Sequence, residues 1–267
     1  MTPDFSSYRT LAIEEAAPGV LAVRFNRPEV LNAINTEMLH ELLRFFGPLA
    51  FTPGDLRAIV LTGTGMRAFC AGGDLKERKA MSNDDWRLQH AVIEESAYAV
   101  LNAAEPVIAA VNGVAYGGGC ELALCCDFIY AADTARFALP EVRLGIMPGG
   151  GGTQNLPRAV GERRAKELML TGTEFSANQA LGWGMVNAVF PPDRLMDEAL
   201  AAATRISEAA PISVRQIKKS IHQGLQTDLT TGLLLEVQAY ERVIGTRDRL
   251  EGVLAFNEKR PPSFEGR

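Results

Sequence analysis

The chain has 267 residues, of which 27 are Lys or Arg and 32 are Asp or Glu, so its formal net charge is −5. A hydrophobic fraction of 47% and a charged fraction of 22% are typical of a globular protein and exclude disordered and collagen-like chains. The slight acidity gives no electrostatic reason to bind nucleic acid or an anionic membrane, and no apolar run approaches the ~18 residues that span a bilayer.

The first part of the chain predicts a hairpin, a helix and a buried strand. Residues 8–13 and 20–25 are strand-like stretches on either side of the turn Ala17-Pro18-Gly19, which is the pattern of a β-hairpin. Apolar side chains then recur at helical spacing over residues 36–46, and a Gly-Pro pair ends that helix. The β-branched run at residues 56–61 predicts a short buried strand.

Further along, strand-like and helical patterns alternate. Residues 106–111 predict a second buried strand, and residues 85–102 before it predict a helix, so we expect an α/β fold. From about Ala159 onward the pattern is almost wholly helical. The helices expected there lie at residues 176–181, 193–208, 212–223 and 229–244. We therefore predict an α/β core over residues 1–190 and a helical region over residues 191–267.

Three glycine clusters stand out, at residues 71–74, 117–119 and 149–152. Tight turns are the simplest explanation of any such cluster. The second cluster, however, follows a strand and precedes a helical stretch, which exposes backbone N–H groups at a helix N-terminus, where the dipole favours negative charge. We interpret Gly117-Gly118-Gly119 as a donor to an oxyanion that forms during a reaction. The pair Gly72-Gly73, also after a strand, is the candidate for a second donor.

Residues 63–68 have the Gly-x-Gly-x-x-Ala spacing of a dinucleotide-binding site. In that site the motif opens a helix directly, because the pyrophosphate sits on the helix N-terminus. Here the motif continues into another turn at Ala71-Gly72-Gly73, and the chain has no Gly-Lys-Ser/Thr phosphate loop. A nicotinamide site is therefore not expected.

Two glutamates lie in unusual surroundings. Glu121 is in the first turn after Gly117-Gly118-Gly119, and Glu141 follows Pro140 after the strand-like residues 136–139. Each has an ordinary explanation, as a helix-dipole contact or as a solvated loop residue. Both also border apolar and Gly-rich segments, where burial would raise their pKa values, as general acid–base catalysis at neutral pH requires. Because they are 20 residues apart, only the fold can bring them together.

The cysteine and histidine patterns predict neither a metal site nor a thiol nucleophile. No Cys-x-x-Cys pair is present, and each histidine falls on a separate helical stretch, where a surface or core role is expected. The residues concerned are Cys70, Cys120, Cys125, Cys126, His40, His90 and His222. A Gly-x-Ser-x-Gly elbow, typical of serine hydrolases, is also missing. The segment Met1 to Ser6 lacks the basic and apolar regions of an export signal, so we expect a reduced, cytoplasmic protein.

Five segments, taken in order, resemble one known family. They are residues 68–75 (AFCAGGDL), 110–113 (AVNG), 117–123 (GGGCELA), 139–145 (LPEVRLG) and 148–154 (PGGGGTQ). At this spacing, the chain from Asn26 to Arg260 resembles the enoyl-CoA hydratase/isomerase (crotonase) superfamily. The resemblance implies an α/β fold, a crotonase-like spiral of ββα units, with a helical C-terminal trimerisation region. It also implies a homotrimer or a dimer of trimers and an acyl-CoA thioester substrate, with no separate cofactor and no metal.

The resemblance also assigns roles to individual residues. The backbone N–H groups of Gly73 and Gly118 would form an oxyanion hole around the thioester oxygen; many relatives carry Ala at the first position, which keeps the backbone donor. Glu121 would position and deprotonate the water that attacks Cβ, and Glu141 would deliver a proton to Cα. The residues implied to contact the substrate are Gly73, Asp74, Leu75, Lys76 and Gly118.

Both glutamates together favour an enoyl-CoA hydratase, a hydro-lyase acting on a short-chain or branched substrate. Two alternatives remain open: Δ3,Δ2-enoyl-CoA isomerisation on the same site, and methylglutaconyl-CoA hydration in leucine breakdown, to whose enzymes residues 74–78, 148–154 and the stretch from Thr246 are similar. Some of those enzymes bind RNA through a lysine-rich helix, but residues 36–57 here contain no lysine, so no nucleic-acid partner is expected. Intact carboxylates and glycines oppose a non-catalytic binding protein. We predict that residues 81–88 form a mobile pocket wall.

Overall fold

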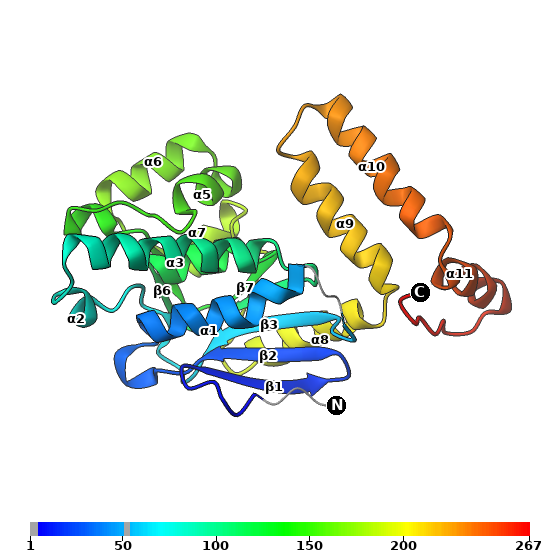
Figure 1. Ribbon diagram of the computed structural model, residues 1–267, viewed down its shortest axis with the longest axis horizontal. Coiled ribbons are helices and arrows are strands. Elements are labelled where there is room, and N and C mark those ends of the chain that lie inside the picture. The colour runs from blue at the N-terminus through cyan, green and yellow to red at the C-terminus, as the bar shows by residue number, and fades with distance from the viewer. Residues whose placement is uncertain (1–4, 51–53) are drawn as a thin grey trace.

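The computed structural model describes residues 5–50 and 54–267 (Figure 1). Residues 1–4 of the segment examined for an export signal, and residues 51–53 of the lysine-free stretch, lie outside the described residues. Among the described residues, no helix is both long enough and apolar enough to cross a membrane.

A six-stranded sheet forms the centre of the molecule. Its strands, in spatial order, are β1 (Leu11–Ala17), β2 (Val20–Phe25), β3 (Ala58–Gly63), β5 (Val107–Val111), β7 (Phe128–Ala132) and β10 (Ala188–Phe190). The first two form an antiparallel hairpin, and the other neighbours pair in parallel. Every residue of β3 and β5 is buried, as expected for parallel strands that are covered on both faces.

A second, four-stranded sheet carries the loops that become important below. Its strands, in spatial order, are β4 (Ala68–Cys70), β6 (Val114–Tyr116), β8 (Arg136–Ala138) and β9 (Phe175–Ser176). The pairs β3–β4, β5–β6 and β7–β8 each give one strand to each sheet, and helices follow each pair. Those helices are α2 (Leu75–Arg78) and α3 (Asn83–Leu101), then α4 (Gly118–Cys125), then α5 (Gly152–Val160). This succession is the predicted spiral of ββα units, so the expected fold class is confirmed.

Helix α1 (Thr36–Phe46) covers the hairpin and α3. It begins where expected because the Asn35 side chain accepts a hydrogen bond from the Met38 N–H. Its one buried carboxylate, Glu41, accepts hydrogen bonds from the backbone N–H groups of Arg9, Thr10 and Leu11. These bonds hold the start of the hairpin against the helix.

Six helices follow α5, and they divide into a core layer and a projecting arm. They are α6 (Glu162–Thr171), α7 (Ala177–Gly182), α8 (Leu195–Ser207), α9 (Pro211–Gly224), α10 (Leu229–Ile244) and α11 (Arg247–Glu258). Helix α8 packs on the central sheet, whereas α9 and α10 pair with each other and, with α11, project from the body of the molecule (Figure 1). No residue of α10 is buried. Lys218 of α9 anchors the arm to the core through an ion pair of 2.8 Å with Asp127.

The helices predicted from apolar spacing are confirmed, with α10 matching its predicted ends. The expectation that the chain is almost wholly helical from about Ala159 onward is wrong at β9 and β10, and the helices expected there did not include α6 or α11. Strands of two or three residues are too short to show a period, so only their pairing with β8 and β7 reveals them. The division at residue 190 stays a prediction, although α8 lies against the sheet and the arm begins at α9.

Candidate active site

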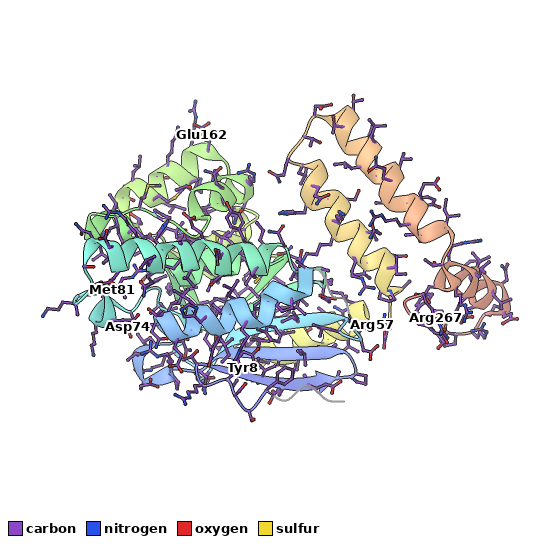
Figure 2. All side chains as sticks on the ribbon, in the orientation of Figure 1. Tyr8, Arg57, Asp74, Met81, Glu162 and Arg267 are labelled. Carbon is purple, nitrogen blue, oxygen red and sulfur yellow. The ribbon has the colours of Figure 1, made fainter. Side chains whose placement is uncertain are left out.

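A cavity of about 330 Å³ lies where the loops after β4, β6 and β8 meet the N-terminal half of α3. It is lined by all four of the residues that were predicted to carry the chemistry: Gly73, Gly118, Glu121 and Glu141. In Figure 2, Asp74 and Met81 lie on either side of α2 at this end of the molecule, far from the helical arm near Arg267. The fold therefore brings together residues that are up to 68 positions apart, from Gly73 to Glu141.

Two backbone N–H groups in this cavity have no hydrogen-bond partner among the described residues. Neither the Gly73 nor the Gly118 amide donates a hydrogen bond to another residue in the described part of the chain. Gly118 is the first residue of α4, so its N–H is one of the unpaired donors of a helix N-terminus. The two loops approach closely because Gly72 has a φ of +91°, and an added Cβ there would lie 2.8 Å from the Tyr116 oxygen. An oxygen atom in the cavity has both donors available.

Glu121 is held by the third glycine cluster. It lies in the first turn of α4, is only 4% exposed, and its Oε1 accepts hydrogen bonds of 2.8 Å from the N–H groups of Gly150 and Gly152. Burial raises the pKa of Glu121, while these amide donors act in the opposite direction. The carboxylate is therefore fixed in position but remains a stronger base than an exposed glutamate.

Glu141 begins a 3-10 turn, η3 (Glu141–Leu144), directly after Pro140. It is 8% exposed, and its buried Oε2 has no hydrogen-bond partner among the described residues. Burial and, to a lesser extent, the nearby charge of Glu121 raise the pKa of Glu141 to about 7, against the lowering effect of Arg78. A carboxyl group with this pKa exchanges a proton readily at neutral pH.

Arg78 is a site residue that the sequence did not indicate, because nothing marks it in the polar run after Gly73. An added Cβ on Gly73 would lie 2.8 Å from Cζ of Arg78, so the guanidinium lies over this glycine. Its Nε donates a hydrogen bond of 2.9 Å to Gln89, and its Cζ is 4.8 Å from the centre of the Trp86 ring. A fixed positive charge therefore faces both carboxylates.

His90, for which a surface or core role was expected, lines the cavity instead, from the middle of α3. The Gly150 and Gly152 donors to Glu121 were also missed, although their cluster was visible as glycines 149–152. The position of a histidine on an amphipathic helix does not indicate which cavity its side chain will line. Its place depends on how α3 crosses the loop before α5.

The remaining predicted substrate residues lie in different surroundings. Leu75 lines the cavity and is half-exposed. The Asp74 carboxylate instead caps α2 by accepting from the Lys76 N–H, and it pairs with Arg27 at 3.0 Å. Lys76 is exposed and does not line the cavity. Contact of Asp74 and Lys76 with a substrate stays a prediction, as does the mobility of residues 81–88, of which residues 83–88 begin α3.

The cysteines occupy the core. Cys70, Cys120 and Cys125 are buried, and burial raises the pKa of Cys70 and Cys125 to about 12, so these thiols are poor nucleophiles. Within residues 5–50 and 54–267, no group of three His, Cys, Asp or Glu side chains is placed to hold a metal ion.

Comparison with known proteins extends these observations over the whole chain. The model of the enoyl-CoA hydratase/isomerase family matches residues 15–267. A short-chain-enoyl-CoA hydratase of Clostridium acetobutylicum is 41% identical, over 90% of this chain and 92% of that relative. A crotonyl-CoA hydratase of Syntrophomonas wolfei is 39% identical, over 97% of this chain and 98% of that relative.

The fold has equally similar solved counterparts. The crystal structure of an enoyl-CoA hydratase from Bacillus anthracis superposes with a TM-score of 0.95 and 44% sequence identity, covering 97% of this chain and 100% of that one. The match of the family model, the identities above and the fold agree with the resemblance in the sequence motifs. The chain belongs to the enoyl-CoA hydratase/isomerase family.

Proposed function

We propose that this protein is an enoyl-CoA hydratase, which adds water reversibly across the 2,3 double bond of a short-chain or branched enoyl-CoA to give a 3-hydroxyacyl-CoA. The observation that carries the proposal is one cavity lined by two unpaired amide donors and two buried carboxyl groups. Relatives named short-chain-enoyl-CoA hydratase and crotonyl-CoA hydratase support the same activity.

The two amide donors would bind the thioester oxygen. Attack on Cβ moves electrons through Cα to this oxygen, which gains negative charge as the enolate forms. The N–H groups of Gly73 and Gly118 are available to donate to it, because neither has a partner among the described residues. Each preorganised donor of this kind contributes on the order of 3 kcal/mol to stabilising the transition state.

The two carboxyl groups would divide the acid and base roles. Glu121, held by Gly150 and Gly152, takes a proton from water as the water oxygen bonds to Cβ. Glu141, whose pKa of about 7 leaves it partly protonated at neutral pH, gives its proton to Cα. Hydration thus moves one proton from water to Glu121 and one from Glu141 to the substrate. The reverse reaction uses the same groups with their protonation exchanged.

This division predicts a bell-shaped pH dependence of kcat/KM for hydration. Since burial raises the pKa of Glu141 to about 7, the rate falls above that pH as Glu141 loses the proton that Cα must receive. Since burial also raises the pKa of Glu121 above its ordinary 4.5, the rate falls again at acid pH. Because Glu121 and Glu141 interact, the apparent pKa values of the two limbs are those of the coupled pair. Initial rates with crotonyl-CoA between about pH 5 and 9 test this; a rate still rising above pH 8 would contradict it.

The direct test of the proposed function is the loss of enoyl-thioester absorbance when the protein is added to crotonyl-CoA. Rapid loss, with 3-hydroxybutyryl-CoA as product, is the expected result. If folded protein hydrates neither crotonyl-CoA nor methylglutaconyl-CoA, the proposed function is wrong. Conversion of a 3-enoyl-CoA to the 2-enoyl isomer without hydration would establish the isomerase alternative.

The proposal includes an acyl-CoA thioester as substrate and no separate cofactor, because CoA is part of the substrate. It also includes a cytoplasmic location and a homotrimer or dimer of trimers. Large apolar side chains exposed on the arm support self-association; they include Leu229, Leu233, Leu234, Val237 and Tyr240 of α10. A monomeric mass in sedimentation equilibrium would contradict the oligomer.

A further inference from the structure

A second cavity adjoins the active-site cavity. It has a volume of about 380 Å³ and lies between the middle of α3 and the start of α5. Four residues line both cavities: His90, Met147, Gly149 and Gly150. The partition between the two cavities therefore consists of only the His90 side chain and the short loop that contains Met147, Gly149 and Gly150.

The His90 side chain closes this partition. It reaches from α3 to the loop before α5, where an added Cβ on Gly149 would overlap its Nε2. On its other side, Nδ1 lies 3.3 Å from Oε1 of Glu94, one helical turn away. The imidazole is thus held between Glu94 and Gly149. It is still 42% exposed, because it faces both cavities rather than a packed core.

The acyl tail of the proposed substrate points toward this partition. In the proposed reaction Cβ lies beside Glu121, which activates the water. Gly150 adjoins that carboxylate, since an added Cβ on Gly150 would lie 3.2 Å from Oε2 of Glu121. A tail that continues from Cβ past Glu121 therefore meets Gly149, Gly150 and His90.

Beyond His90, the second cavity suits an alkyl chain. Apolar residues there include Ala97, Leu101, Met147 and Pro148, and polar groups are added by Glu94, Thr153, Gln154 and Asn155. Buried apolar contacts are worth about a fourfold gain in kcat/KM for each methylene removed from water. A tail confined to the first cavity cannot make them.

Resting on the proposed function, we propose that His90 determines the acyl-chain length by closing the active-site cavity behind a short tail. The native protein then prefers C4 and C6 enoyl-CoA, and the second cavity receives a longer tail only when the imidazole is removed. Glu121 and Glu141 lie on other elements. Because His90 also interacts electrostatically with Glu121, a control variant has to separate that effect from the loss of side-chain bulk.

The test compares kcat/KM for trans-2-enoyl-CoA substrates with four, six, eight and ten carbons. For His90→Ala we expect the ratio of kcat/KM for the C8 substrate to that for the C4 substrate to rise at least tenfold. His90→Gln is the matched control, because glutamine has a similar reach but no charge. Its ratio is expected to stay within threefold of wild type.

Two results would overturn the proposal. One is a His90→Ala variant that still hydrates crotonyl-CoA but has an unchanged ratio of C8 to C4 activity. The other is an equal rise of this ratio in His90→Ala and His90→Gln, which would assign the effect to the lost electrostatic interaction of the imidazole with Glu121 rather than to the lost bulk. If His90→Ala does not fold, His90→Ser is judged by the same ratio.

Adding Ala97→Leu to His90→Ala should refill the second cavity and reverse the rise in the ratio of C8 to C4 activity. If wild type hydrates no chain length, the proposed function itself fails, which is a distinct result.

Discussion

Replacing Glu141 with Gln is expected to lower kcat for crotonyl-CoA hydration by roughly a thousandfold, with little change in KM. Glutamine keeps the shape of the side chain but cannot give a proton to Cα. Binding depends on the cavity and the two amide donors, which the substitution leaves in place. Steady-state rates of the purified variant, at the pH of maximal wild-type activity, provide the measurement.

Two controls accompany this variant. Glu162→Gln changes a glutamate at the exposed start of α6 and should leave kcat unchanged. The alkaline limb of the pH profile, which we assign to Glu141, should also disappear from the residual activity of Glu141→Gln. If the variant retains kcat within tenfold of wild type, Glu141 is not the proton donor.

Gly152→Ala is expected to lower kcat about a hundredfold, although both Glu121 and Glu141 are kept. An added Cβ at this position would lie 2.9 Å from Oε1 of Glu121 and 3.0 Å from Cβ of Pro148, so the glutamate has to move. Displacing a catalytic group by about 1 Å commonly costs a factor of this size. The measurement is kcat with crotonyl-CoA, together with thermal unfolding to show that the variant is folded.

The matched control is Gly182→Ala at the end of α7, where an added Cβ meets nothing within 4 Å. Its activity should equal that of wild type, and its stability should stay the same or rise, because Ala restricts the unfolded chain more than Gly does. A Gly152→Ala variant within threefold of wild type would show that the Gly150–Gly152 donors do not set the position of Glu121.

Much of the fold could be predicted because its strongest signals are local. The strands β3 and β5 are short apolar runs bounded by turn residues, and α10 shows its apolar spacing over four turns. The strands β9 and β10 could not be predicted, because two or three residues become a strand only through hydrogen bonds to a distant partner. The first strand also begins at Leu11 rather than at residue 8, since Tyr8 packs edge-on against Phe45.

The candidate site also contains some residues whose place follows from local sequence and others whose place depends on distant contacts. Gly118 and Glu121 share one helix turn, so their proximity follows from local geometry. Glu141 joins them in the cavity because β8 pairs with β6, and only the family motifs indicated that arrangement. Arg78 and His90 were missed, since their place in the cavity depends on how α2 and α3 cross the loops of other repeats. A contact of that kind leaves no pattern in the residues around it.

The parallel pairing of β4 with β6 has a consequence for the spacing of the two N–H groups that we propose as oxyanion donors. Gly73 follows one of these strands and Gly118 follows the other, and neighbouring strands in a sheet run ~4.8 Å apart. Two N–H groups that each donate to one oxygen at ~2.9 Å must have nitrogens no more than ~5.8 Å apart. The strand spacing meets this geometric limit without help from any side chain. Sequence changes in the surrounding helices can therefore accumulate while the separation of the donors stays constant, provided that the register of these two strands is kept.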